Sequence, residues 1–295
     1  MDTNKTFRCS VAARERGDSM VATAPPAQRW LLIEHEGSWP VNALDVFRPG
    51  VGRPLAVRAA AQQTRISLIR RPGRHPRTEG PIRWALADVR PGQEGIRWGT
   101  VRTAADLIEA EWHVDPGEGE PVAIVCAHSR HDVCCAMQGR PVAAALADRW
   151  PGRVWECSHL GGDRFAATMV LLPHGLCYGR VTPEGGAEIL TAQERGLVRP
   201  AHLRGRCALS RLSQAAQALV REAGMGSDGI GDLLPLSEVE VADDEFEVVL
   251  SGSPDLAVRV REAAIPLGTP ATCRAANDAF GREYEMVSVE LLGAG

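Results

Sequence analysis

Residues 121–165 decide how this chain is organised, and they read PVAIVCAHSRHDVCCAMQGRPVAAALADRWPGRVWECSHLGGDRF. They contain four of the eight cysteines and three of the eight histidines in the chain. The apolar run 121–125 predicts a strand that ends at Cys126, and a second run, 154–157, leads to His159. Thiols and imidazoles at the ends of two strands that bracket one helix are suited to an iron–sulfur or a zinc site. The sequence therefore predicts a metal centre in this stretch.

The segment between these two strands predicts a polar loop followed by a helix. The loop carries Cys134 and Cys135, and the helix is expected over residues 139–150. His128 and His131 also belong to the loop. We expect them to be solvated side chains or hydrogen-bond donors beside the ligands, and not ligands themselves.

A similar order of elements precedes this stretch. A strand from Trp30, a helix over 52–63, a strand over 65–73, a hairpin and a helix from Thr103 follow one another. After residue 121 the same order recurs as strand, helix, strand, hairpin and helix. We therefore expect an internal duplication of a β-α-β-β-β-α unit.

Local matches between the two copies support the duplication. The tripeptide GRP at 52–54 recurs at 139–141, and residues 71–73 fall where residues 159–161 fall. Two parallel strands joined by a helix, followed by an antiparallel hairpin and a closing helix, are the thioredoxin-like arrangement. The predicted fold class is α/β (α+β), with two tandem thioredoxin-like units and a small C-terminal α+β appendage.

The chain divides into four predicted regions that differ in their cysteines. They are a lead-in at 1–29, a degenerate thioredoxin-like unit without cysteines at 30–118, a ferredoxin-like unit at 119–197 and the appendage at 198–295. The appendage predicts one amphipathic helix over 210–223 and three short strands. Cys9, Cys207 and Cys273 are expected to be isolated structural thiols.

Composition excludes several classes of function. A net charge of −4 on 295 residues indicates neither a nucleic-acid partner nor a membrane surface. The start of the chain lacks a signal-peptide pattern, so we expect a cytoplasmic protein, in which thiols stay reduced. Lys5 is the only lysine. A Walker A loop, a Schiff-base enzyme and an SxxK hydrolase are thereby excluded, because each requires a lysine in its site.

Two further interpretations use the same residues. A structural zinc ion could be held by Cys126, Cys135, Cys157 and His159. A thioredoxin-like thiol-redox enzyme could use Cys126, Cys134 or Cys135 as its nucleophile, although the chain contains no CxxC motif.

The segments RHDVCCAMQGRPV, WECSHLGGDRFA and LPHGLCYGRV resemble the sucrase/ferredoxin-like family. The resemblance extends from RCS near the start of the chain to HLRGR in its second half. It implies a thioredoxin-like ferredoxin domain that binds a [2Fe–2S] cluster with mixed cysteine and histidine ligation. It also implies an electron carrier rather than an enzyme, with a reductase or an oxidase as its partner.

The resemblance carries over to individual ligands. Cys126 and Cys135 match the first two ligands of the family, and His159 matches the first histidine of its HxGGH motif. Asp163 stands where that motif has its second histidine, so the predicted ligands are Cys126, Cys135, His159 and Asp163. Cys157 and Cys134 remain alternatives for the fourth position, since Cys157 would point the same way as His159 if the strand continued through both.

Overall fold

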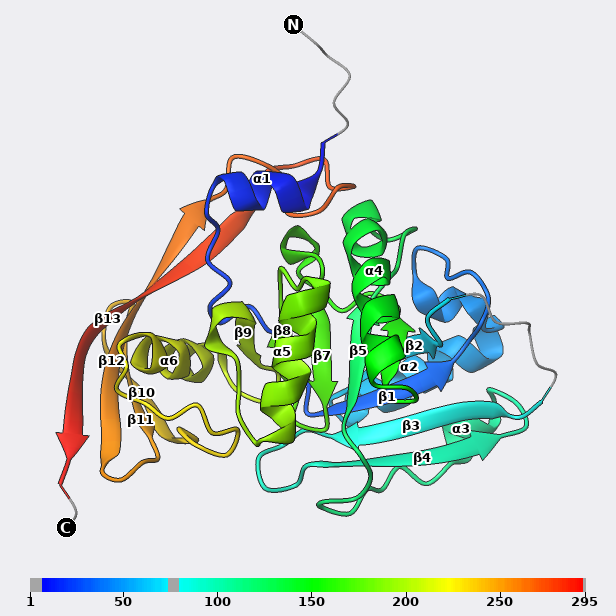
Figure 1. The fold of residues 1–295 in the computed structure, drawn as a ribbon, viewed down its shortest axis with the longest axis horizontal. Coiled ribbons are helices and arrows are strands. Elements are labelled where there is room, and N and C mark those ends of the chain that lie inside the picture. Colours follow the sequence, from blue (N-terminus) through cyan, green and yellow to red (C-terminus); the bar gives the residue numbers. More distant parts are fainter. Residues whose placement is uncertain (1–6, 74–79, 294–295) are drawn as a thin grey trace, which may run out of the picture.

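A nine-stranded sheet forms the centre of the molecule in this computed structural model, which describes residues 7–73 and 80–293 (Figure 1). Its strand order is β4-β3-β1-β2-β6-β5-β7-β8-β9. The strands are β1 (Arg29–Glu34), β2 (Thr64–Arg70), β3 (Ile82–Asp88), β4 (Gly95–Val101), β5 (Val122–Cys126), β6 (Val154–Cys157), β7 (Met169–Leu172), β8 (Leu176–Tyr178) and β9 (Leu203–Arg206).

The two halves of this sheet follow the same order of elements. In each half two parallel strands flank a helix, and a hairpin then adds two antiparallel strands beside the first of them. The helices are α2 (Pro49–Ala61) and α3 (Asp106–Glu109) in the first half, and α4 (Val133–Arg149) and α5 (Pro183–Glu194) in the second. The mixed α/β class is thus confirmed. The likeness to thioredoxin and the four region boundaries stay predictions.

The halves join through a short antiparallel contact between β2 and β6. Ile69 pairs with Cys157 and Arg70 with Glu156, and the Arg70 and Glu156 side chains form an ion pair of 2.7 Å. A two-fold axis perpendicular to the sheet relates antiparallel neighbouring strands, and rotation about this axis does not exchange the two faces of the sheet. Helices α2 and α4 therefore cover the same face of the sheet.

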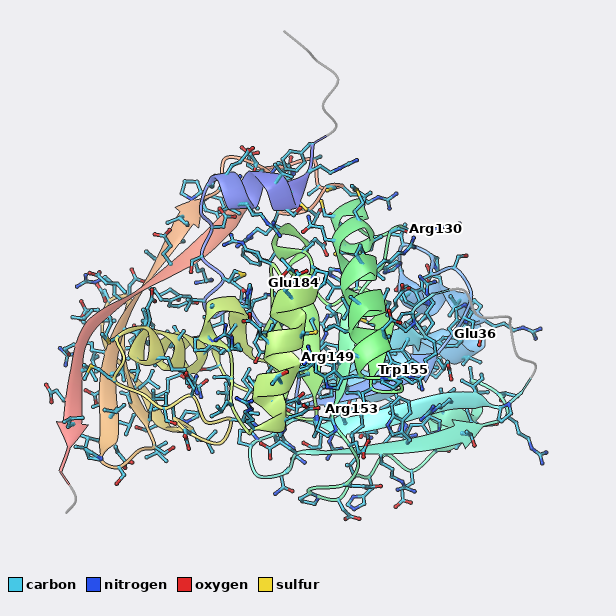
Figure 2. The ribbon with its side chains drawn as sticks, in the orientation of Figure 1. Glu36, Arg130, Arg149, Arg153, Trp155 and Glu184 are labelled. Carbon is cyan, nitrogen blue, oxygen red and sulfur yellow. The ribbon has the colours of Figure 1, made fainter. Side chains whose placement is uncertain are left out.

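Side chains alternate between the two faces of the strands, as the period of two requires. Ala123 and Val125 pack with Val142 of α4, whereas Ile124 and Cys126 belong to a cluster on the opposite face that both halves share. Trp155 lies in that shared cluster, below the end of α4 and beside the β3–β4 hairpin (Figure 2). It stacks on Trp98 at 5.4 Å, and the Arg71 guanidinium lies 3.5 Å from its ring centre. Cation–π and stacking contacts thus reinforce the junction.

Two helices begin before the predicted positions. α4 begins at Val133, six residues before the expected start, so Cys134 and Cys135 lie in its first turn and not in a loop. α2 begins at Pro49. Both errors have one cause. Proline is favoured in the first turn of a helix and disfavoured further in, so the helices were predicted to begin just before Pro54 and Pro141. In the structure both prolines lie inside the helices.

The lead-in and the helix predicted from Thr103 also differ from expectation. A helix, α1 (Cys9–Glu15), forms within the lead-in, for which no element was predicted, and residues 1–6 lie outside the described residues. α3 has only four residues, Asp106–Glu109. Short 3₁₀ turns occur at η1 (Ala43–Val46), η2 (Asp163–Phe165) and η3 (Pro200–His202).

The C-terminal region forms the predicted amphipathic helix and two strands more than predicted, because β9 joins the central sheet and β10 adds a fourth strand to the C-terminal one. α6 (Arg211–Glu222) packs on an antiparallel sheet of β10 (Pro235–Ala242), β11 (Glu245–Leu250), β12 (Asp255–Pro266) and β13 (Phe280–Leu292). β10 was missed because its residues remain exposed or half-exposed at the sheet edge and show no buried face. Figure 1 shows α1 beside the loop that joins β12 to β13. Within the described ranges, no helix is both long and apolar enough to span a membrane.

We predict that Gly139→Ala in α4 disrupts the fold. A β-carbon at this position would stand 1.9 Å from the Cys126 carbonyl oxygen, so the helix would have to move off β5. The expected loss is about 3 kcal/mol of unfolding free energy or more. Gly50→Ala in α2 is the control, because a β-carbon there meets no atom within 4 Å. Urea unfolding of both variants checks this, and equal stabilities would contradict it.

We predict that Asp88→Asn lowers stability at neutral pH by about 1–2 kcal/mol. Asp88 is 3% exposed and accepts hydrogen bonds from Arg29 at 3.0 Å and from Arg90 at 2.9 Å. Burial raises the pKa of Asp88, but the two guanidinium groups outweigh burial and lower it below its ordinary 3.8. Because the folded-state pKa is the lower one, the wild-type advantage is complete above that ordinary value and is lost as the pH falls through the folded-state pKa.

The measurement is urea unfolding of wild type and Asp88→Asn at neutral pH and in acid. The stability difference should shrink in acid, and Asp115→Asn, at an exposed ion pair, should change little at either pH. A difference that grows as the pH falls would refute the assignment.

Candidate metal centre

The end of β5 and the first turn of α4 bring the first two predicted ligands together. Asp132 is the N-cap of α4 and accepts a hydrogen bond from the Cys134 backbone N–H at 2.8 Å. This cap fixes where the helix begins. Gly139 then allows the helix to lie directly on the end of the strand, and the Cys135 thiol hydrogen-bonds to Cys126.

All four predicted ligands lie in one chain of contacts. Cys135 Sγ and His159 Nδ1 each lie 3.1 Å from the same oxygen, Oδ1 of Asp163. Cys126 joins the group through Cys135. Cys126, Cys135 and Asp163 are 0%, 1% and 2% exposed, whereas the His159 side chain is 31% exposed. The structure therefore places Cys135 and His159 at one buried carboxylate oxygen, and the ligand atoms of His159 and Asp163 lie within 4.8 Å of each other and of His131.

The two thiols differ in their affinity for a proton. The hydrogen bond from Cys135 outweighs burial and lowers the pKa of Cys126. The same contact, together with burial, raises the pKa of Cys135 well above its usual value. Of the two, Cys126 is thus the thiol that loses its proton more readily, and the thiolate is the form in which cysteine binds metals.

The histidine and the carboxylate stabilise each other's charged form. Burial lowers the pKa of His159, but the Asp163 carboxylate more than offsets this, so the pKa lies above its usual value. Burial raises the pKa of Asp163, and His159, Cys135 and His131 together hold it below its usual value. The His131 ring lies 3.6 Å from that of His159, centre to centre.

His128 positions His159 through hydrogen bonds, one of the two roles that the sequence left open for it. Its Nδ1 accepts the His159 backbone N–H at 3.3 Å, while Nε2 lies 2.7 Å from the Pro40 carbonyl oxygen, to which it donates. It is 1% exposed, and burial lowers its pKa. A neutral His128 therefore ties the loop after β6 to the first half of the molecule, and of its two expected roles the solvated one was wrong.

The loop after His159 turns back on itself through two glycines. Gly161 and Gly162 have φ angles of 92° and 79°, in the region that side chains disfavour. The Arg204 guanidinium donates to the Gly161 carbonyl at 2.9 Å and lies where a Gly162 side chain would stand. This turn carries Asp163 back to His159.

A cavity of about 510 Å³ opens beside the exposed edge of His159. His128 and His131 line it on one side, and residues of η1 and α2 line the other. The cysteine-free half therefore forms one wall of the approach to the site.

The two alternative ligands are placed differently. Cys157 lies beside Cys126 in the register of the parallel strands, but among the described residues it makes no hydrogen bond to the other candidates. Burial raises the pKa of Cys157 well above its usual value. Cys134 turns away from Cys135, because adjacent residues of a helix do not face each other.

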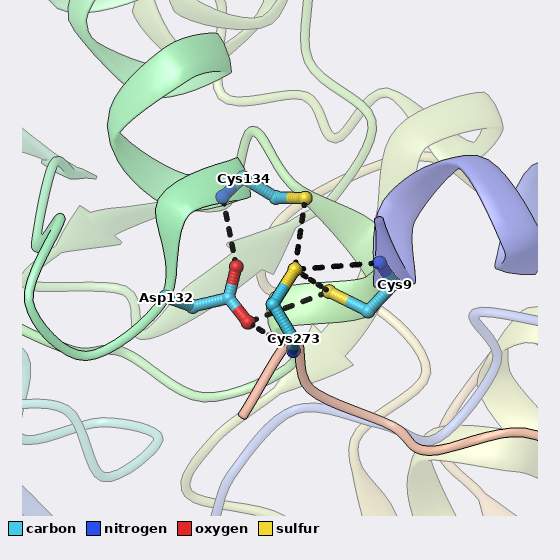
Figure 3. Close-up of side chains that lie close together, drawn as sticks. All are labelled: Cys9, Asp132, Cys134 and Cys273. Carbon is cyan, nitrogen blue, oxygen red and sulfur yellow. Dashed lines mark hydrogen bonds between the residues drawn. The ribbon is translucent and has the colours of Figure 1, made fainter. Parts of the chain in front are cut away.

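Cys134 instead belongs to a second group of potential ligands, with Cys9, Asp132 and Cys273 (Figure 3). The ligand atoms of the four residues all lie within 4.8 Å of one another. The expectation that Cys9 and Cys273 are isolated was wrong, because their sulfurs lie 3.5 Å apart. No sequence pattern signals this group, since its members come from three distant segments.

Cys207 is not isolated either. Its Sγ accepts a hydrogen bond from Trp30 Nε1 at 3.3 Å, and its thiol lies beside that of Cys177. Among the residues that the structure describes, all the cysteines are unpaired thiols.

Comparison with known proteins gives one match. No curated protein and no solved structure matches the chain. The family model described as sucrase/ferredoxin-like matches residues 20–205, which run from the lead-in to β9 and include all four predicted ligands. This match covers more than half of the 295 residues, and the chain therefore belongs to the sucrase/ferredoxin-like family.

Proposed function

We propose that this chain is an electron-transfer protein that binds a [2Fe–2S] cluster through Cys126, Cys135, His159 and Asp163. One observation carries the proposal: the Cys135 thiol and the His159 ring converge on the same buried oxygen of Asp163, with the Cys126 thiol beside them. Four buried or half-buried donors from two strand ends form a set suited to two irons.

The donor chemistry fits such a cluster. The thiols come from β5 and α4, and the imidazole and carboxylate come from the loop after β6, which provides two pairs of donors. Nδ1 of His159 is buried and makes no hydrogen bond, although Asp163 Oδ1 lies 3.1 Å away. Buried polar atoms normally have a hydrogen-bond partner, so this ring nitrogen supports a ligand role. A bound cluster would accept and release one electron.

Exposure favours an electron carrier over a thiol-redox enzyme. Cys126, Cys134 and Cys135 are 0%, 2% and 1% exposed, so a disulfide substrate cannot reach their sulfurs. The His159 ring is the accessible edge, and electrons would pass through it to a redox partner protein docked over the cavity. We place the protein in the cytoplasm, where its unpaired cysteines would stay reduced.

The first test is the metal content of protein purified without oxygen. We expect two irons and two acid-labile sulfides per chain, a red-brown colour and a paramagnetic signal on reduction. Cys126→Ser should lose the colour, whereas Cys207→Ser, at a buried thiol outside the site, should keep it. A colourless protein with zinc bound by Cys126 and Cys135 would support the structural zinc site instead. A protein that takes up no metal on anaerobic reconstitution would refute both.

We predict that Asp163→His keeps the cluster and raises its reduction potential by on the order of 100 mV. A neutral imidazole replaces an anionic carboxylate, so adding an electron meets less repulsion. Cys157→Ala is the control and should leave the potential unchanged, since no hydrogen bond links the Cys157 thiol to Asp163 or His159 within the described ranges. Voltammetry of the three proteins measures this. Loss of the cluster in Cys157→Ala, with Asp163→His unchanged, would make Cys157 the fourth ligand.

A further inference from the structure

The second cysteine group joins three segments that are far apart in the sequence. Cys9 begins α1, Asp132 and Cys134 begin α4, and Cys273 lies in the loop between β12 and β13 (Figure 3). Cys273 lies 139 positions after Cys134 and 264 after Cys9. A group assembled from so many parts of the chain depends on the folded state.

The spacing of the sulfurs matches a single tetrahedral ion. Cys273 Sγ lies 3.4 Å from Cys134 Sγ and 3.5 Å from Cys9 Sγ, and Cys9 Sγ lies 3.5 Å from Asp132 Oδ2. With Zn–S bonds of about 2.3 Å and a Zn–O bond of about 2.0 Å, tetrahedral ligands stand about 3.8 Å apart between sulfurs and about 3.5 Å between sulfur and oxygen. The sulfurs would have to separate by only a few tenths of an ångström to admit the ion.

The same distances disfavour the two other uses of clustered cysteines. A disulfide bond is about 2.05 Å long, so any two of these sulfurs would have to approach by well over 1 Å. An iron–sulfur cluster distributes its thiolates over several irons and holds them further apart than this group does.

The charges in the group also point to a cation. Asp132 is 0% exposed, and none of the ion pairs among the described residues includes it. Its oxygens accept backbone N–H groups of Cys134 at 2.8 Å and of Cys273 at 2.7 Å. Buried charges are generally paired or bound to metals, and metal-binding carboxylates are themselves held by hydrogen bonds.

One member of the group lies where negative charge is stabilised. Cys134 is in the first turn of a 17-residue helix, and the helix dipole there favours a thiolate.

We propose that Cys9, Cys134, Cys273 and Asp132 bind a structural Zn²⁺ ion, distinct from the iron–sulfur site and independent of it. The ion fastens α1 and the β12–β13 loop to the start of α4. Cys273 is the least buried of the four, and the ion would enter on its side. The site thereby gives the C-terminal region a fixed attachment to the unit that carries the other candidate ligands.

The test measures zinc and iron separately. We expect about one zinc per chain in protein isolated with reductant, and binding of cadmium with a sulfur-to-metal charge-transfer band at the same stoichiometry. Cys9→Ser/Cys273→Ser should lower zinc affinity by more than about 100-fold and keep the visible colour of the iron site. Cys126→Ser should keep the zinc affinity and lose the visible colour of the iron site. Cys207→Ser is the control for loss of a buried thiol elsewhere.

A second readout does not depend on a variant that folds. Removing zinc from the wild-type protein with a chelator should speed tryptic cleavage after Arg274, an exposed residue next to Cys273, by about tenfold or more. Added zinc should reverse the change.

Three results would overturn the zinc site. They are wild-type protein that binds neither zinc nor cadmium at this stoichiometry, equal zinc binding by the double variant, and a disulfide between two of the three cysteines in protein alkylated at lysis. Failure of the iron–sulfur proposal would be seen separately, as a colourless protein that still binds zinc through Cys9 and Cys273.

Discussion

The close approach of α4 to the end of β5 is the constraint on which both cysteine groups depend. At Gly139 there is no room for a β-carbon beside the Cys126 carbonyl, so the helix lies directly on the strand. This contact sets how far the first helical turn extends beyond β5, and it places Cys135 against Cys126. The Asp132 cap fixes the rotation at which that turn begins. The glycine and the capping carboxylate thus position the thiols, although neither residue is a predicted iron ligand.

The cysteine-free half acts on the site through packing. The loop after β1 supplies the Pro40 carbonyl oxygen, which accepts a hydrogen bond from His128. His128 in turn accepts a hydrogen bond from the His159 backbone N–H. The antiparallel junction at Arg70 and Glu156 brings α2 to the same face as α4, so that α2 forms one wall of the cavity beside His159. If the halves arose by duplication, one copy has kept the donor residues and the other has become their support.

The sequence was sufficient for the order of elements and for singling out Cys135, His159 and Asp163, which lie in contact, because strand ends, glycines and a recurring GRP tripeptide are local signals. It was insufficient wherever a distant segment decides the outcome. Cys9 and Cys273 carry no local sign of their meeting, which requires α1 and the β12–β13 loop to dock on α4. The start of α4 was misplaced because Pro141 was taken as a first-turn residue. His128 could have been found only by knowing that Pro40 lies beside it.

The adjacent pair Cys134 and Cys135 connects the two groups, and helix geometry explains why they do not compete. Successive residues of an α-helix point about 100° apart, so one thiol faces β5 and the other faces α1. The same turn of backbone then belongs to both groups. A shift of α4 that loosened the contact with Cys273 would also move Cys135 relative to Asp163. The C-terminal region, although distant in sequence, can therefore influence the geometry of the buried donors through a single helical turn.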